Sequence, residues 1–280
     1  MSRSPGTRSP GTRSPGTLDR LSFEGLLHLL AILAMVLLLA PTLIVLVVSF
    51  TDGLSLRFPP PGYSLRWYGE LLEAWQLHYA LKNSLTVAVL ATALAVGLGV
   101  LAALAVARSP RLSARLLDSF FLSPLILPAL AFGLSSLMFF SLLGWPVSVA
   151  TLVLGHTVVC VPYVVRNTVA ALTQLQPSLL EGSASLGASR LYTFRRITLP
   201  LIRPGILSGG FLAFMASFDN IPVSLFLRDA ATDMLPIRMW QDLEGRLDVT
   251  IAALSGILIV ATIGGIAVME RVTGLSRRLV

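Results

Sequence analysis

The stretch from residue 119 to residue 165 reads SFFLSPLILPALAFGLSSLMFFSLLGWPVSVATLVLGHTVVCVPYVV and holds no Asp, Glu, Lys or Arg in 47 residues. A helix that crosses a membrane needs roughly 20 apolar residues, because the hydrocarbon layer is about 30 Å thick and a helix rises about 1.5 Å per residue. The stretch is therefore too long for one span. Gly144, Trp145 and Pro146 divide it, which predicts one span at 119–142 and another at 147–165.

Four further apolar segments lie outside this stretch, at residues 26–48, 84–107, 205–227 and 249–269. Of the 280 residues, 55% are hydrophobic and only 12% are charged, which is about half the charged fraction of an ordinary soluble domain. The segment at 26–48 is longer than the apolar core of a signal peptide, so we expect it to be the first transmembrane helix. The pattern predicts an all-α membrane protein with six transmembrane helices.

The basic residues indicate how these spans are oriented. If the N-terminus lies in the cytoplasm, the cytoplasmic segments hold 15 of the 21 Lys and Arg residues and the outer segments hold six. Cytoplasmic loops of membrane proteins carry an excess of Lys and Arg, so both termini are expected to be cytoplasmic. The net charge of +7 is then explained by orientation and by contact with membrane lipid, and no nucleic-acid partner is expected.

Several local sequence features predict further details of the chain. Residues 3–17 contain three copies of Arg-Ser-Pro-Gly-Thr, a composition that cannot bury apolar surface, so residues 1–20 are expected to be disordered. Pro124, Pro128 and Gly133 are expected to bend or unwind the span at 119–142. Asn83-Ser84-Leu85 stands at the start of the second span.

The residues of enzyme active sites and metal sites are sparse. Cys160 is the only cysteine, and it lacks any metal-ligand spacing. The three histidines are scattered, and His156, in the middle of a span, is expected to be packed and hydrogen-bonded. The chain has no Gly-x-x-x-x-Gly-Lys-Ser/Thr phosphate loop, so ATP must be bound elsewhere. We therefore expect no catalytic residues, no metal and no cofactor, and the chain is not expected to be an enzyme.

The longest cytoplasmic connection in this topology runs from residue 166 to residue 204. Pro177 suits the first turn of a helix, where its missing N–H would be unpaired anyway. Gly187 can adopt the left-handed conformation that ends a helix, and Ser189 can cap the start of a second short helix. Pro200 and Pro204 are expected to end this second helix before the fifth span. The segment thus predicts a helix, a glycine turn and a helix.

This segment resembles the "EAA" loop of ABC importer permeases, in which Glu-Ala-Ala is followed at fixed spacings by Gly, Ile and Leu-Pro. The matching residues are Glu181, Gly187, Ile197, Leu199 and Pro200. Gly182 and Ser183 replace the two alanines; they keep the small size but lower the helix propensity by roughly 0.5–1 kcal/mol each.

The resemblance implies a type I permease core at residues 80–269 with a cytoplasmic coupling loop at 166–204. In that family the first short helix of the loop seats in a cleft on a cytoplasmic ATPase subunit. The implied partners are a dimer of ATPase subunits, a second permease subunit and an extracytoplasmic substrate-binding protein. The implied location is the bacterial inner membrane.

Two further segments, Ser217-Phe218-Asp219-Asn220 and Leu235-Pro236-Ile237-Arg238, resemble the polyamine (spermidine/putrescine) branch of these permeases. Asp219 is the only acid inside a predicted span, and ionisable residues at such positions usually mark a pathway. Asp219 and Asn220 are therefore candidates for the substrate pathway. Alternatively, the pair lines a seam between subunits, or Pro222 breaks the helix and leaves both near the outer surface.

The predicted function is a permease subunit that forms half of the translocation pathway of an ATP-driven importer for polyamines. Two alternatives remain open at this point. The chain is an ABC importer permease for another small solute, or it is a secondary transporter or channel that works without an ATPase.

Overall fold

A computed structural model of the chain describes residues 17–109, 111–229, 231–246 and 248–274. Throughout this described part the regular elements are helices, and the sole β contact is an isolated bridge between Thr51 and Tyr63. The Arg-Ser-Pro-Gly-Thr repeats begin at residue 3 and, as far as residue 16, lie outside the described residues. Helix α1 (Thr17–Val48) begins at the end of the repeats, so residues 17–20, which the sequence assigned to the tail, are helical.

Five helical segments of the described chain are long and apolar enough to cross a membrane. They are α1, α3 (Trp75–Arg108), α6 (Val149–Thr173), α9 (Leu199–Phe218) together with the short turns before it, and α12 (Thr250–Thr273). A sixth span results if α4 (Arg111–Ile126) and α5 (Ala129–Leu142) are counted together, although their axes meet at 99°. When α4 and α5 are counted as one span, the prediction of an all-α protein with six apolar spans is confirmed.

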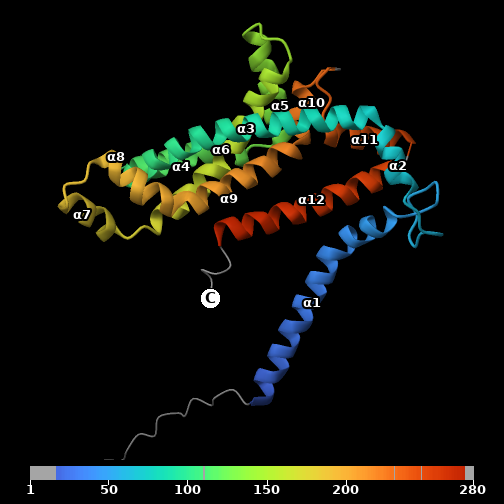
Figure 1. Ribbon diagram of the computed structural model, residues 1–280, viewed down its shortest axis with the longest axis horizontal. Coiled ribbons are helices and arrows are strands. Elements are labelled where there is room, and N and C mark those ends of the chain that lie inside the picture. The colour runs from blue at the N-terminus through green and yellow to red at the C-terminus, as the bar shows by residue number, and fades with distance from the viewer. Residues whose placement is uncertain (1–16, 110, 230, 247, 275–280) are drawn as a thin grey trace, which may run out of the picture.

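The bend expected in the third span lies between α4 and α5, at Leu127 and Pro128. Beyond the bend, α5 turns away from the long axis of the body and lies against the short helix α10 (Ile221–Leu227) (Figure 1). Gly133 makes this approach possible, because a Cβ there would lie 2.5 Å from the carbonyl oxygen of Pro222. No side chain tolerates such a contact, so glycine is required here.

Helices α3, α6 and α9 form the packed core of the body. Small residues bring their backbones together: a Cβ on Gly99 of α3 would lie 2.7 Å from Val164 Cβ, and one on Gly209 of α9 would lie 2.9 Å from Val164 Cα. Close approach through glycine and alanine is the usual means of packing helices in a membrane, where burial of apolar surface supplies no driving force. Val164 of α6 is accordingly fully buried between its two neighbours.

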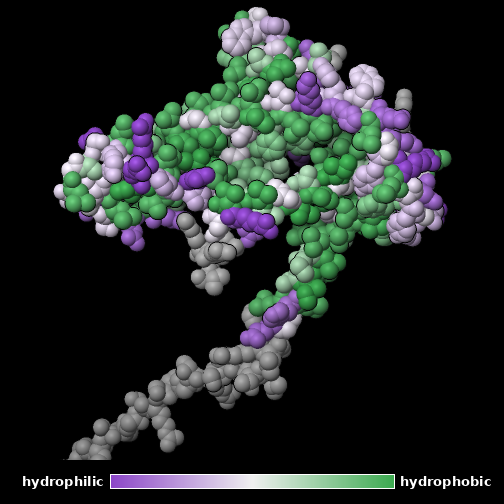
Figure 2. All heavy atoms as spheres, viewed as in Figure 1, coloured by the Kyte–Doolittle hydropathy of each residue, from purple (hydrophilic) through white to green (hydrophobic). Residues whose placement is uncertain are grey.

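Short helices cover the two ends of the body (Figure 1). At one end lie α2 (Arg66–Glu73) and α11 (Leu235–Arg246); at the other lie α7 (Pro177–Ser185), α8 (Arg190–Thr193) and the π-helical turn η1 (Phe194–Thr198). Figure 2 shows hydrophobic residues along α1 and along much of the body, with hydrophilic residues gathered around α2 and α11. This is the polarity of a protein whose middle lies in lipid and whose ends lie in water.

Helix boundaries differ from the hydropathy pattern at several spans, among them α3 and α6. Helix α3 begins at Trp75 and not at residue 84, and α6 continues past residue 165 to Thr173. Hydropathy reports the part of a helix that lies in hydrocarbon, whereas backbone hydrogen bonding continues into the polar region beyond it. The connection predicted at 166–204 therefore begins and ends with helical residues.

The expectation that Pro200 and Pro204 end the second short helix of the loop is wrong. Helix continues from Arg190 through η1 and into α9 as far as Phe218, with both prolines inside α9. A proline ring ordinarily clashes with the carbonyl four residues earlier. The π-helical turn directly before Pro200 widens the helix, which relieves that clash at the first turn of α9.

Candidate functional site

The hairpin formed by α7 and α8 has the geometry expected of helix, glycine turn and helix. Pro177 occupies the first turn of α7, and Gly187 has a φ of 74°, in the left-handed region. The N–H of Gly187 donates to the carbonyl of Ala184 at 2.9 Å, and the N–H of Ala188 donates to the carbonyl of Ser183 at 3.1 Å. This pair of bonds is the Schellman motif, which satisfies the last carbonyls of the helix.

The two helices of the hairpin are held together by side chains as well. Ser189 caps α8 by accepting a hydrogen bond from the N–H of Tyr192 at 3.3 Å. The hydroxyl of Ser183, which is 7% exposed, lies 2.8 Å from the hydroxyl of Thr193. Sequence reasoning treated Ser183 only as a small replacement for alanine and missed this bond, because nothing in the local pattern pairs it with a residue ten positions later.

The outer surface of the hairpin is apolar and open. A groove of about 750 Å³ runs between α7 and α8. Its lining includes Leu179, Gly182, Leu186, Gly187, Tyr192 and Ile197. Leu186 is 89% exposed, and a Cβ added to Gly182 would meet nothing within 4 Å. An apolar groove in a polar end of the molecule is typical of a protein contact surface.

The remaining residues of the EAA-like pattern lie on and beside this hairpin. Glu181 is exposed on α7. Ile197 belongs to η1, and Leu199 and Pro200 begin α9, which continues directly into the core. The first part of the pattern therefore lies on the exposed hairpin, and the last part lies at the start of the spanning helix α9.

The break between α9 and α10 forms the second candidate site. Helix α9 ends at Phe218, Asp219 follows, and Asn220 caps α10 by accepting a hydrogen bond from the N–H of Val223 at 2.9 Å. Pro222 stands in the first turn of α10, where its missing N–H costs nothing. The predicted interruption of the fifth span near Asp219 is thus a helix end followed at once by a new helix start.

A cavity of about 440 Å³ opens beside this break. It is lined by Asp219 and Asn220 together with residues of α4, α5 and α6, among them Phe132 and Tyr163. The Asn220 side-chain oxygen is occupied by the cap of α10, whereas Asp219 is exposed. A carboxylate beside aromatic rings is a combination that binds organic ammonium groups, through ion pairing and cation–π contact. Sequence reasoning did not identify Phe132 or Tyr163.

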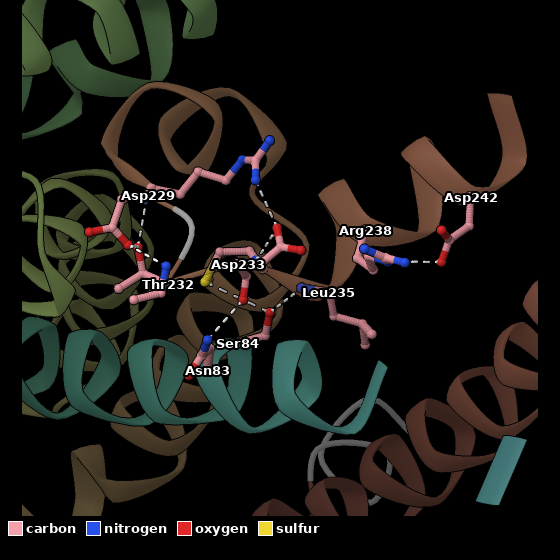
Figure 3. A network of polar contacts seen from close by, with 11 residues as sticks. Asn83, Ser84, Asp229, Thr232, Asp233, Leu235, Arg238 and Asp242 are labelled. Atoms are coloured by element: carbon pink, nitrogen blue, oxygen red, sulfur yellow. Dashed lines mark hydrogen bonds and ion pairs between the residues drawn. The ribbon is translucent and has the colours of Figure 1, made fainter. Parts of the chain in front are cut away.

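A polar network at the end of the molecule bearing α11 joins segments that are far apart in the sequence (Figure 3). Asn83 Nδ2 donates to the carbonyl of Asp233 at 3.0 Å, and Ser84 Oγ accepts from the N–H of Leu235 at 2.8 Å. Arg228 forms an ion pair with Asp233 at 2.9 Å. The hydrogen bonds from Asn83 and Ser84 hold the segment that follows α10 against α3.

Metal binding has no visible basis in the described part of the chain, where no three His, Cys, Asp or Glu side chains are grouped to hold an ion. The structure brings the EAA-like residues together at one end of the body, and it places Asp219 and Asn220 away from them, beside α10 (Figure 1). Helices α6 and α9 extend from the hairpin to the break.

Apolar spanning helices with a break at a carboxylate beside a cavity are features of multi-pass membrane transport proteins. Residues 95–278 match the family described as "Binding-protein-dependent transport system inner membrane component". The chain belongs to this family. It is a permease subunit of an ABC importer and a multi-pass protein of the inner membrane.

Two relatives illustrate the position of the chain within the family. It is 34% identical over 245 residues to "Putrescine transport system permease protein PotI" of Escherichia coli (strain K12), covering 84% of this chain and 87% of the relative. It is 29% identical over 236 residues to "Spermidine/putrescine transport system permease protein PotC" of Haemophilus influenzae, covering 83% and 90%. The chain is thus close to polyamine permeases in sequence.

A solved structure supports the fold. The crystal structure of a bacterial alginate ABC transporter, in complex with a periplasmic protein bound to an alginate pentasaccharide, contains a chain that superposes with a TM-score of 0.70. The superposition covers 94% of this chain and 96% of that chain at 17% sequence identity. The architecture is therefore that of an ABC importer permease.

Proposed function

We propose that this permease carries cationic polyamines across the inner membrane, driven by separate ATPase subunits that dock on the α7–α8 hairpin. The observation that carries the proposal is the open apolar groove of that hairpin, in which Leu186 is 89% exposed. An exposed apolar groove of this kind marks a site of protein interaction. In this arrangement the hairpin and both termini lie in the cytoplasm, and a dimer of ATPase subunits hydrolyses the ATP.

Two further partners belong to the proposal. A second permease subunit completes the pathway; α1 leaves room for it, because only 6% of its most apolar part is buried against the rest of this chain and the remainder is open to a partner as well as to lipid. An extracytoplasmic binding protein delivers the substrate at the end of the body that carries α2 and α11. Such a protein is part of the alginate transporter that shares the fold.

The substrate class is supported by the cavity at the break. Asp219 supplies a negative charge, and Phe132 and Tyr163 supply aromatic surface, which together suit an alkyl diamine with a positive charge at each end. Similarity to PotI and PotC points to the same class of substrate. In this proposal Asp219 and Asn220 lie on the pathway.

The docking part is tested by purifying the complex from cells that express all of its subunits. Leu186→Asp is expected to remove the ATPase subunits from the purified complex, because it places a charge in the groove without disturbing a buried side chain. Leu54→Asp is the matched control: Leu54 is 76% exposed in the segment between α1 and α2 and contributes nothing to the hairpin. Equal ATPase recovery from both variants would contradict the docking proposal.

The transport part is tested in proteoliposomes that contain the assembled complex and the binding protein. ATP-dependent uptake of radiolabelled putrescine is the expected result. Uptake driven by an ion gradient without ATPase subunits would contradict the role proposed for those subunits. ATP-dependent uptake of a neutral or anionic solute, with no uptake of putrescine, would place the chain among importers for another small solute.

A further inference from the structure

The hairpin and the broken span are connected by one rigid unit. Helix α6 ends at Thr173 and α7 begins at Pro177, while α8 and η1 continue into α9. Helices α6 and α9 touch at backbone distance, because a Cβ on Gly205 would lie 2.7 Å from the carbonyl oxygen of Asn167, and one on Gly209 would lie 3.0 Å from that of Tyr163. Two helices packed this closely cannot slide past one another without a clash.

This rigid unit ends at the break, where α10 begins as a separate helix. Helix α10 has seven residues, and a helix this short is not stable by itself. Packing holds it on two sides: a Cβ on Gly155 of α6 would lie 2.6 Å from Leu227 Cδ1, and Gly133 of α5 lies directly against Pro222. The position of α10 therefore depends on its contacts with α5 and α6.

His156 of α6 joins both sides of the break. Its Nδ1 lies 2.8 Å from Ser217 Oγ, on the last turn of α9, and its Nε2 lies 3.1 Å from Ser224 Oγ, on α10. The imidazole is fully buried, and each serine is 1% exposed. A neutral imidazole has one donor and one acceptor, and a serine hydroxyl can be either, so both contacts are satisfied together. Ser217 and Ser224 stand on either side of Asp219 and Asn220.

We infer that His156 is a positioning residue for transport: it fixes the geometry of the α9–α10 break and passes movements of α6 to the Asp219–Asn220 site. The inference rests on the proposed function, because it requires that the ATPase subunits move the hairpin. A buried polar bond across a break is suited to this role, since no water competes for its partners and its loss leaves buried groups unpaired.

The first experiment measures the geometry without transport. Nitroxide labels at Val158→Cys of α6 and Leu225→Cys of α10, which are 44% and 45% exposed, report the distance between the two helices in the assembled complex. Cys160 is fully buried and does not compete for the label. We expect a narrow distance distribution in the wild type and a broad one in His156→Leu and in Ser224→Ala. Thr157→Val is the matched control, because the Thr157 hydroxyl is buried on the same helix and, among the described residues, bonds only to the Val153 carbonyl of that helix.

The second experiment measures putrescine transported per ATP hydrolysed in proteoliposomes. His156→Leu is expected to lower this ratio about tenfold, because two buried hydrogen bonds are removed. The ratio should be unchanged in Thr157→Val. His156→Asn, which retains a polar atom near the position of Nδ1, and His156→Gln, which retains one near Nε2, should each recover part of the ratio. A merely structural histidine would lower the yield of the complex without changing the ratio.

The outcomes distinguish the positioning role of His156 from the proposed function. If His156→Leu fails to assemble, Ser224→Ala carries both measurements, since it removes a single oxygen. The inference is overturned if the distance distribution and the transport ratio of these variants match those of Thr157→Val while the wild type transports putrescine. Absence of ATP-dependent uptake by the wild type refutes the proposed function instead, and the label distances then still report whether His156 holds the break.

Discussion

Substitution of Gly187 gives the most direct test of how the hairpin is built. The residue has a φ of 74°, and a Cβ added there would meet nothing within 4 Å. Substitution of Gly187 is therefore unfavourable because of its backbone conformation alone, since there is space for a side chain. An L-residue in the left-handed region costs about 1–2 kcal/mol, and a β-branched one is disfavoured most strongly.

The expected loss of ATPase binding can be worked out from the strain at this turn. Gly187→Val is expected to cost about 2 kcal/mol of strain and to weaken the two Schellman bonds by about 1 kcal/mol in total. A loss of about 3 kcal/mol corresponds to roughly 100-fold weaker binding of the ATPase subunits, because 1.4 kcal/mol is a factor of ten. Gly187→Asn should weaken binding by less than about fivefold, since asparagine tolerates the left-handed region.

The assay is a titration of purified ATPase subunits onto the permease complex in nanodiscs. Gly144→Val is the control outside the hairpin: Gly144, between α5 and α6, has a φ of 70°, and a Cβ added there would meet nothing within 4 Å. Valine there should cause a similar backbone strain without weakening the binding of the ATPase subunits. The reasoning is refuted if valine at position 187 binds as the wild type does, or if asparagine is as damaging as valine.

Three further substitutions test the remaining contacts. Ser183→Ala removes the bond to Thr193 and should destabilise the hairpin by about 1 kcal/mol, measured as faster amide hydrogen exchange across residues 177–198; unchanged exchange would show that the bond contributes nothing. Asp219→Asn should raise the KM for putrescine about tenfold or more through loss of a charged contact, while ATPase recovery stays normal; an unchanged KM removes Asp219 from the pathway. Gly133→Val should displace α10 and lower the melting temperature of the complex in detergent, whereas Gly97→Val, at a site with nothing within 4 Å, should not.

The hairpin could be predicted from the sequence because its determinants are local. Proline in a first helical turn, glycine at a left-handed position and serine at a helix cap each act on residues within about four positions. The structure has all three features at Pro177, Gly187 and Ser189. The expectation about Pro200 was wrong for a related reason, since a widened turn before a proline has no sequence signature that we recognised.

The second candidate site could be predicted only in part. Asp219 was conspicuous as a carboxylate inside an apolar segment, and Pro222 marked the break beside it. The cavity itself is built by residues of α4, α5 and α6, which no local pattern joins to the fifth span. The partners of His156 lie 61 and 68 positions away, so sequence reasoning predicted that this histidine is hydrogen-bonded without identifying its partners.

The sequence by itself determined how many apolar segments there are, where they are interrupted and which connection forms a capped hairpin. These properties depend on the free energy of transferring each residue into lipid and on the backbone preference of each residue. Both quantities add up residue by residue along a short stretch of the chain, so they can be read from the sequence. Only the tertiary structure decided that α5 turns by 99°, that α10 lies against Gly133 and Gly155, and that His156 spans the break. These depend on which small residues of distant helices meet, because close packing in a membrane is set by matching surfaces and not by hydrophobicity.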